Sequence, residues 1–139
     1  MPTHVFPANY QALSNIHEFI AAEASRFGLS GRDLYAVELS VSEAASNIID
    51  HAYSGQGSGI IEISTETRAD AFAITFRDYG APFDPALVAS PDVNSPLDCR
   101  PERGLGVFLM RKMMDEVIFD FSVPGVNTLT MTKRKSAEP

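Results

Sequence analysis

The sequence has one cysteine, no tryptophan and no long apolar run. A single cysteine, Cys99, excludes a disulfide within the chain, so a reducing compartment is expected. No apolar run is long enough to cross a membrane, and the N-terminal residues do not have the pattern of a signal peptide. These observations predict a cytoplasmic protein that does not associate with membranes.

Basic residues are also scarce. The chain has 11 Lys and Arg against 18 Asp and Glu, which gives a formal net charge of −7 at pH 7. A nucleic-acid-binding protein usually has a basic face, so we expect no direct contact with nucleic acid. The short basic run at 133–135 is interpreted as a solvated terminus. The remaining composition, with 45% hydrophobic residues, predicts a single compact domain over residues 1–139.

The spacing of apolar residues predicts the order β-α-α-β-β-loop-α-β-β. Asn9 and Ser30 are the expected N-caps of the first two helices, Asp33 is placed to form a capping box, and Gly28 ends the first helix. This order predicts an α/β fold of the α+β type, a two-layer sandwich with a mixed sheet and helices on one face. The expected strands are 3–6, 61–65, 72–76, 118–123 and 129–133, and the expected helices are about 9–27, 30–52 and from 105 onward.

The first group of candidate site residues lies on the second helix. Glu43, Asn47 and His51 are four residues apart, so they line one strip of that helix, about 120° round from its apolar stripe. The amide oxygen of Asn47 suits Mg²⁺ when phosphates supply other ligands, and Glu43 can accept a proton. Taken alone, the same pattern is that of a solvated polar helix face.

The second group follows a predicted strand. The carboxylate of Asp78 can accept a hydrogen bond from the exocyclic amine of adenine. Gly80 would let the backbone approach a purine closely, and Pro82 would stiffen the turn. Taken alone, these residues also suit an ordinary polar turn.

The third group precedes the last predicted helix. Arg103, Gly104, Leu105 and Gly106 lie directly before it, and glycines there let phosphate oxygens reach the N–H groups and the positive end of the helix dipole. Taken alone, a Gly-x-Gly pair is equally typical of a flexible helix entry. Between the second and third groups, the segment 79–103 contains five prolines and little periodicity, which is typical of a functional or mobile loop.

Together, the three groups resemble the N, G1 and G2 boxes of the GHKL superfamily of ATPases and kinases. Within that superfamily the chain is most similar to the anti-sigma factor serine kinases, the regulators of partner-switching pathways. The resemblance extends from about residue 5 to residue 133 and implies a Bergerat-type ATP-binding domain. The matching positions are Glu43, Asn47 and His51; Asp78, Gly80 and Pro82; and Gly104, Leu105 and Gly106.

The resemblance implies a role for each matching position. Glu43 would be the catalytic base and Asn47 the Mg²⁺ ligand, and residues 87–103 would form the ATP lid. Asp78, Gly80 and Thr128 would contact adenine, while Gly104 and Gly106 would hold the phosphates. The whole set implied for nucleotide binding is Asn47, His51, Asp78, Gly80, Pro82, Arg103, Gly104, Leu105, Gly106 and Thr128.

Two positions depart from the family pattern. Arg103 stands before Gly104 where many relatives have a small residue, so it would add a phosphate contact or restrict the lid. Asn127 stands before Thr128 where the family usually has glycine. Asn tolerates positive φ better than most residues, so we expect a turn there to be retained.

The resemblance implies transfer of phosphate from ATP to a serine or threonine of an anti-anti-sigma (antagonist) protein. It also implies that the chain sequesters a sigma factor and forms a homodimer. Three alternatives stay open: a binding module without catalysis, the ATP-binding half of a sensor histidine kinase, and a partner-switching kinase whose output is not a sigma factor. No arrangement of His4 and His17 supplies the phosphoacceptor helix pair of a histidine kinase.

Overall fold

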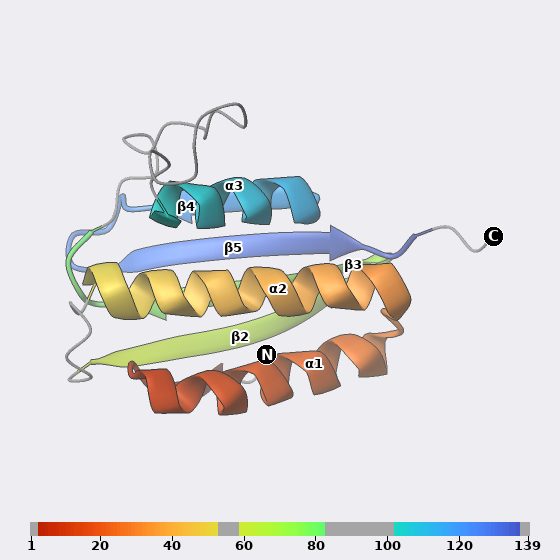
Figure 1. Cartoon of the computed structure of the whole chain (residues 1–139), viewed down its shortest axis with the longest axis horizontal. Coiled ribbons are helices and arrows are strands. Elements are labelled where there is room, and N and C mark those ends of the chain that lie inside the picture. Colours follow the sequence, from red (N-terminus) through yellow and green to blue (C-terminus); the bar gives the residue numbers. More distant parts are fainter. Residues whose placement is uncertain (1–2, 53–58, 83–101, 137–139) are drawn as a thin grey trace.

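The computed structural model describes residues 3–52, 59–82 and 102–136. In this part of the chain, three α-helices cover one face of a five-stranded sheet, so the predicted two-layer fold is confirmed (Figure 1). None of the described helices is long and apolar enough to span a bilayer. The elements follow the predicted order: β1 (Thr3–Pro7), a 3₁₀ turn (Tyr10–Ala12), α1 (Leu13–Phe27), α2 (Gly31–Asn47), the π-helical turn η2 (Ile48–Ala52), β2 (Ile60–Arg68), β3 (Ala71–Asp78), α3 (Glu102–Met113), β4 (Glu116–Asp120) and β5 (Asn127–Arg134).

The sheet has the strand order β1-β2-β3-β5-β4, and every pairing among the described strands is antiparallel. The prediction of a mixed sheet was therefore wrong. The α1–α2 pair between β1 and β2 returns the chain to the end where it started, so β2 runs antiparallel to β1. The crossover through α3 sets β4 in the same direction as β3, but β5 lies between them, so no parallel pair forms.

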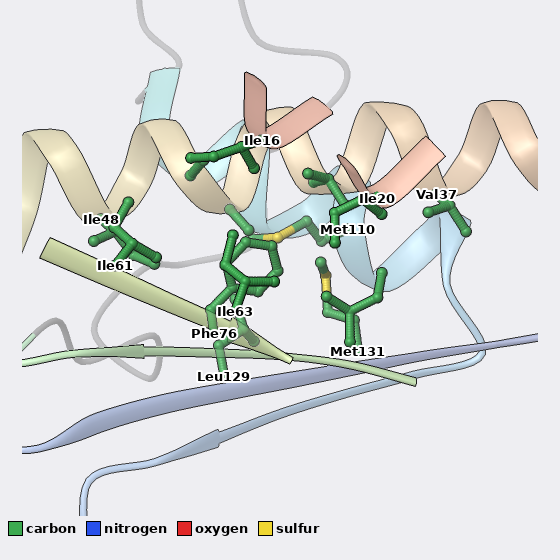
Figure 2. Packing of buried hydrophobic residues seen from close by; sticks show 14 of the residues in the cluster. Ile16, Ile20, Val37, Ile48, Ile61, Ile63, Phe76, Met110, Leu129 and Met131 are labelled. Carbon is green, nitrogen blue, oxygen red and sulfur yellow. The ribbon is translucent and has the colours of Figure 1, made fainter. Parts of the chain in front are cut away.

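The hydrophobic core lies between the helix layer and the sheet (Figure 2). Side chains at helical spacing on α1, α2 and α3 meet the inward-facing side chains of β2, β3 and β5, as the apolar pattern predicts. Complete burial of one such side chain contributes about 1.5–3 kcal/mol. The largest fully buried side chains include Ile16, Ile20, Val37, Val41, Ile61, Ile63, Phe72, Ile74, Phe76, Met110 and Met131.

The ends of the first two helices follow local signals only in part. Asn9 is an N-cap as predicted: its Oδ1 accepts a hydrogen bond from the Ala12 N–H at 2.9 Å, although it caps the 3₁₀ turn that leads into α1. Gly28 ends α1 with φ of 114°, the left-handed conformation that favours glycine. At the start of α2, however, the Ser30 side chain makes no capping hydrogen bond, so the predicted capping box with Asp33 is absent.

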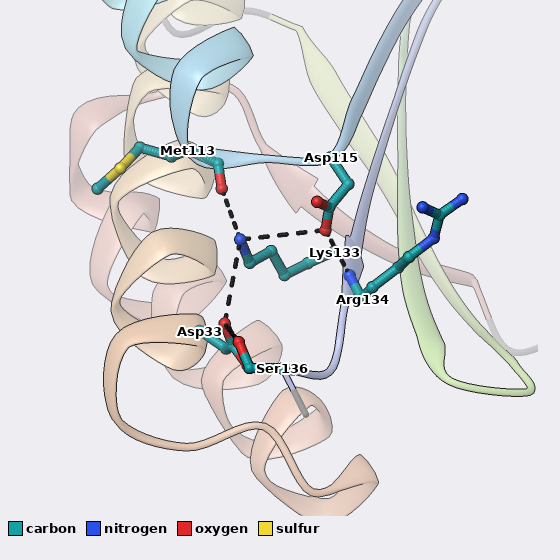
Figure 3. Close-up of polar contacts among 6 residues, drawn as sticks. All are labelled: Asp33, Met113, Asp115, Lys133, Arg134 and Ser136. Atoms are coloured by element: carbon teal, nitrogen blue, oxygen red, sulfur yellow. Dashed lines mark hydrogen bonds and ion pairs between the residues drawn. The ribbon is translucent and has the colours of Figure 1, made fainter. Parts of the chain in front are cut away.

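Asp33 instead binds the end of the chain (Figure 3). Its two carboxylate oxygens accept hydrogen bonds from the N–H and the hydroxyl of Ser136, each at 2.8 Å. Burial alone would raise the pKa of Asp33, but these hydrogen bonds, with the nearby cations of Lys133 and Arg32, hold it below its usual value. The donors of Ser136 therefore take the carboxylate that a capping box would have used.

Lys133 connects this cluster to the end of α3. Its Nζ donates a hydrogen bond to the Met113 carbonyl at 2.9 Å and lies 4.0 Å from carboxylate oxygens of both Asp33 and Asp115. Only 17% of its side chain is exposed. The interpretation of 133–135 as a solvated terminus was therefore wrong for Lys133, because its position on β5 points it toward the helix layer.

Candidate functional site

The candidate site is built around Asp78, the last residue of β3. Phe72, Ile74 and Phe76 face the helices, so the alternation of the strand directs Asp78 inward as well, and only 5% of it is exposed. Its Oδ1 accepts two hydrogen bonds, from the Gly80 N–H at 3.1 Å and from the Asn127 side-chain amide at 2.8 Å. Burial raises the pKa of Asp78, while these two donors act in the opposite direction.

A small, mainly apolar cavity lies beside this carboxylate. It brings together three predicted site residues, Asn47 of α2, Asp78 of β3 and Thr128 of β5. Two aromatic residues of its wall, Phe119 and Phe121, were not predicted as site residues. Their signal was the pair of aromatics two positions apart in the predicted strand 118–123. The full lining is Ala44, Asn47, Ile48, Asp78, Ala81, Phe119, Phe121, Asn127, Thr128 and Leu129.

Asn47 is the last residue of α2 and leaves a polar atom without a partner in the described part of the chain. Its Nδ2 is buried and makes no hydrogen bond there. Leaving a buried donor unpaired costs about 1–3 kcal/mol, so such a group at a cavity indicates where a ligand can bind. Glu43 lies one turn earlier on α2, is half-buried and does not line the cavity.

The predicted strip of Glu43, Asn47 and His51 is regular only between the first two residues. The chain changes at Ile48 from α-helical to π-helical hydrogen bonding, which adds a residue to the turn. His51 therefore does not follow Asn47 at α-helical spacing, and its side chain lies outside the described residues.

The third predicted group lies inside a helix. We expected α3 to begin near Leu105, but it begins at Glu102, so Arg103, Gly104, Leu105 and Gly106 form its first turns. An acidic first residue suits the positive end of the helix dipole, which favours this earlier start. The N–H of Gly104 is then among the first-turn groups that have no partner in the helix, whereas that of Gly106 is beyond them. The side chains of these four residues are outside the described set.

The remaining predicted positions surround the same end of the sheet. Gly80 donates its N–H to Asp78, and the exposed Pro82 is the last described residue before the segment 83–101. Most of the predicted lid at 87–103 lies in that segment and so is outside the described residues.

The geometry suits a flat heteroaromatic ring that carries an amino group. Apolar walls can cover the ring, and the carboxylate of Asp78 can accept a hydrogen bond from the amine. The described residues contain no cluster of three His, Cys, Asp or Glu side chains able to hold a metal. A cation here would therefore depend on the Asn47 amide oxygen together with oxygens of the ligand and water, a set that suits Mg²⁺.

Comparison with known proteins assigns the family. Residues 6–133 match the family described as "Histidine kinase-like ATPase domain". The chain is 36% identical over 132 residues to the serine-protein kinase RsbW of Staphylococcus aureus, which covers 91% of this chain and 82% of the relative. It is 32% identical over 115 residues to the serine-protein kinase RsbW of Bacillus cereus (strain B4264), covering 80% and 71% of the two chains.

Solved structures share the fold. The RsbU and RsbW domains of a Mycobacterium tuberculosis protein superpose with a TM-score of 0.65 at 15% identity, covering 99% of this chain and 34% of that one. The catalytic domain of the histidine kinase ThkA superposes with a TM-score of 0.58 at 14% identity, covering 99% and 100%. The chain therefore belongs to the histidine kinase-like ATPase family, in the group that contains the serine-protein kinases RsbW.

Proposed function

We propose that this chain is an ATP-dependent serine/threonine-protein kinase that phosphorylates an anti-anti-sigma protein and sequesters a sigma factor. The observation that carries the proposal is the buried Asp78 carboxylate beside an apolar cavity that Asn47 and Thr128 also line. The chain also belongs to the group that contains the serine-protein kinases RsbW, which supports ATP as the phosphate donor and a protein hydroxyl as the acceptor.

In this proposal the cavity holds adenine. Asp78 accepts a hydrogen bond from the 6-amino group, Thr128 contributes a polar contact from β5, and Phe119 and Phe121 cover the ring. Gly80 and Pro82 shape the turn beside the base. The start of α3 contains Arg103, Gly104, Leu105 and Gly106, and the free N–H groups of its first turn, including that of Gly104, face the phosphates. Residues 87–103 act as the ATP lid.

Asn47 is the proposed Mg²⁺ ligand, through its amide oxygen. The metal would neutralise charge on the phosphates, which is the main requirement of phosphoryl transfer. Glu43, one turn before Asn47, is the proposed base that takes the proton of the acceptor hydroxyl as it attacks the γ-phosphate. His51 follows on η2 at the same end of the helix.

The partners are proposed on the basis of the relatives and the resemblance. An anti-anti-sigma protein would be the substrate, and a sigma factor would bind competitively to an overlapping surface. We also propose a homodimer, a location in the cytoplasm and no direct contact with nucleic acid or membrane.

The test of catalysis is Glu43→Gln, because it removes the base without changing the shape of the side chain. We expect Mg-ATP affinity within about twofold of the parent and a loss of about 10²-fold or more in phosphate transfer to the purified anti-anti-sigma protein. The matched control is Glu18→Gln, which changes an exposed carboxylate on α1. Calorimetry measures the binding of Mg-ATP. Incorporation of labelled phosphate from ATP into the anti-anti-sigma protein measures transfer.

Two results would contradict parts of the proposal. An unchanged transfer rate in Glu43→Gln would exclude Glu43 as the base. A parent protein that binds Mg-ATP and its partners but transfers no phosphate would be a binding module on the same scaffold.

A further inference from the structure

Asn127 is buried next to Asp78 at the start of β5. The register of β3 and β5 sets these two residues directly opposite each other, and only 8% of Asn127 is exposed. We expected it to occupy a turn position with positive φ. That expectation was wrong, because Asn127 belongs to a regular strand, and Ala69 is the one non-glycine residue with positive φ among those described.

The side-chain amide of Asn127 contacts three oxygen acceptors. Its Nδ2 lies 2.8 Å from Asp78 Oδ1, 3.1 Å from the Gly80 carbonyl and 3.4 Å from the Ala81 carbonyl. The Gly80 and Ala81 carbonyls can only accept, so the NH₂ group must face them and the orientation of the amide is unambiguous. Asn127 thereby ties the turn after β3 to the first residue of β5.

These contacts leave the two oxygens of Asp78 in different states. Oδ1 accepts from both Asn127 and the Gly80 N–H, whereas Oδ2 receives no hydrogen bond from any described residue. The carboxylate therefore cannot rotate without losing two hydrogen bonds, and its second oxygen has no hydrogen-bond partner among the described residues. Both donors also favour the ionised carboxylate against the effect of burial.

We infer that Asn127 is a positioning residue that makes the site selective for purines with a 6-amino group, by holding Asp78 with one oxygen bonded and the other free to accept from that amine. This inference rests on the proposed binding of ATP in the cavity. A glycine, the residue expected at this position from the family pattern, has no side chain to make these contacts. The chain therefore has a polar side chain that holds Asp78 in place at a position where the family pattern has none.

The test compares two nucleotides in calorimetric titrations with Mg²⁺: ATP and purine riboside triphosphate, which lacks the 6-amino group. Asn127→Ala should weaken ATP binding about tenfold or more, the scale of a hydrogen bond to a charged group. It should change the affinity for purine riboside triphosphate less than about twofold. The matched control is Asn15→Ala, which removes an exposed amide on α1, and circular dichroism checks that each variant is folded.

A second variant gives a readout that a merely structural role would not produce. Asn127→Asp sets a second carboxyl against Asp78, and the pair can share one proton at low pH but not when both ionise. No other described residue that lines the cavity has an ionisable side chain. The ratio of variant to parent affinity for ATP should therefore fall as pH rises from about 5.5 to 8. Because both proteins bind the same nucleotide, this ratio does not depend on the titration of the nucleotide itself.

The outcomes separate this inference from the proposed function. Equal losses for both nucleotides in Asn127→Ala, or no loss for either, would overturn the role in reading the amine, and so would a pH-independent ratio in Asn127→Asp. A folded parent that binds neither nucleotide would overturn the proposed ATP site and this inference with it.

Discussion

The sharpest test of the nucleotide site is Asp78→Asn, because the structure predicts opposite effects on binding and on stability. The new amide can place its oxygen where Oδ1 now accepts from Asn127 and the Gly80 N–H. Its NH₂ group then replaces Oδ2 at the cavity. The internal contacts are kept, but the atom that faces the ligand changes from an acceptor to a donor.

Binding should weaken by the value of one charge-assisted hydrogen bond. That value is about 1.5–3 kcal/mol, so the Kd for Mg-ATP should rise about 10- to 150-fold. Calorimetry measures this change directly. The matched control is Asp70→Asn, which alters an exposed carboxylate in the β2–β3 turn.

Stability without nucleotide should change in the other direction. Burial raises the pKa of Asp78 above its value in the unfolded chain, so the folded protein binds the proton more tightly. The contribution of Asp78 to the free energy of unfolding is therefore full at a pH below its unfolded pKa and is lost as pH rises through the folded pKa. At pH 7 the Asn variant should be at least as stable as the parent, and its advantage should disappear toward acid pH.

Urea unfolding between pH 4 and pH 7 measures this difference. Circular dichroism is the suitable signal, since the chain has no tryptophan. Unchanged ATP affinity in a folded Asp78→Asn protein would refute the assignment of Asp78. A large loss of stability at pH 7 would refute the reasoning that the buried carboxylate is retained for binding.

Two further predictions concern the scaffold. Met110→Ala removes most of a completely buried side chain between α3 and the sheet, so the free energy of unfolding, measured with urea, should fall by about 2–5 kcal/mol. A fall of less than about 1 kcal/mol would show that the core collapses around the gap. Lys133→Met removes the hydrogen bond to the Met113 carbonyl and the cation between Asp33 and Asp115. The free energy of unfolding should therefore fall by about 1–3 kcal/mol at pH 7. Because the pKa of Asp33 is lowered in the fold, this loss should shrink as pH falls and the carboxylate protonates; a loss independent of pH would contradict the electrostatic explanation.

The fold was predictable wherever short-range signals decide the structure. The alternation of apolar and polar residues predicted β2 at 61–65 and β3 at 72–76, and the two strands pair in the structure. Gly28 predicted the end of α1, because a left-handed residue there needs no contact from elsewhere in the chain. The family was also predicted, from the order of three short motifs, and the comparisons confirmed it.

Long-range contacts explain the errors. Asp33 has the spacing of a capping box, but its partner Ser136 is 103 positions away and no local pattern announces it. The mixed sheet was an error of the same kind, since a β-α-β crossover suggests a parallel pair until another strand is found between the two. The early start of α3 has a local cause instead. Its glycines lower helix propensity, which predicted a later start, but they are tolerated inside the first turns.

Asp78 and Asn127 show how much of the site is predictable from polar residues at inward-facing strand positions. The inward positions of β3 run Phe72, Ile74, Phe76 and then Asp78, so the alternation itself assigns a carboxylate to the core layer. An isolated buried carboxylate is unfavourable, which means that a polar partner or a ligand has to be close. The sequence alone does not say that Asn127 is this partner, since the two are 49 positions apart and meet only through the β3–β5 register. A charged residue at a predicted inward position therefore predicts that a site exists, while the strand register determines which residue holds the carboxylate in place.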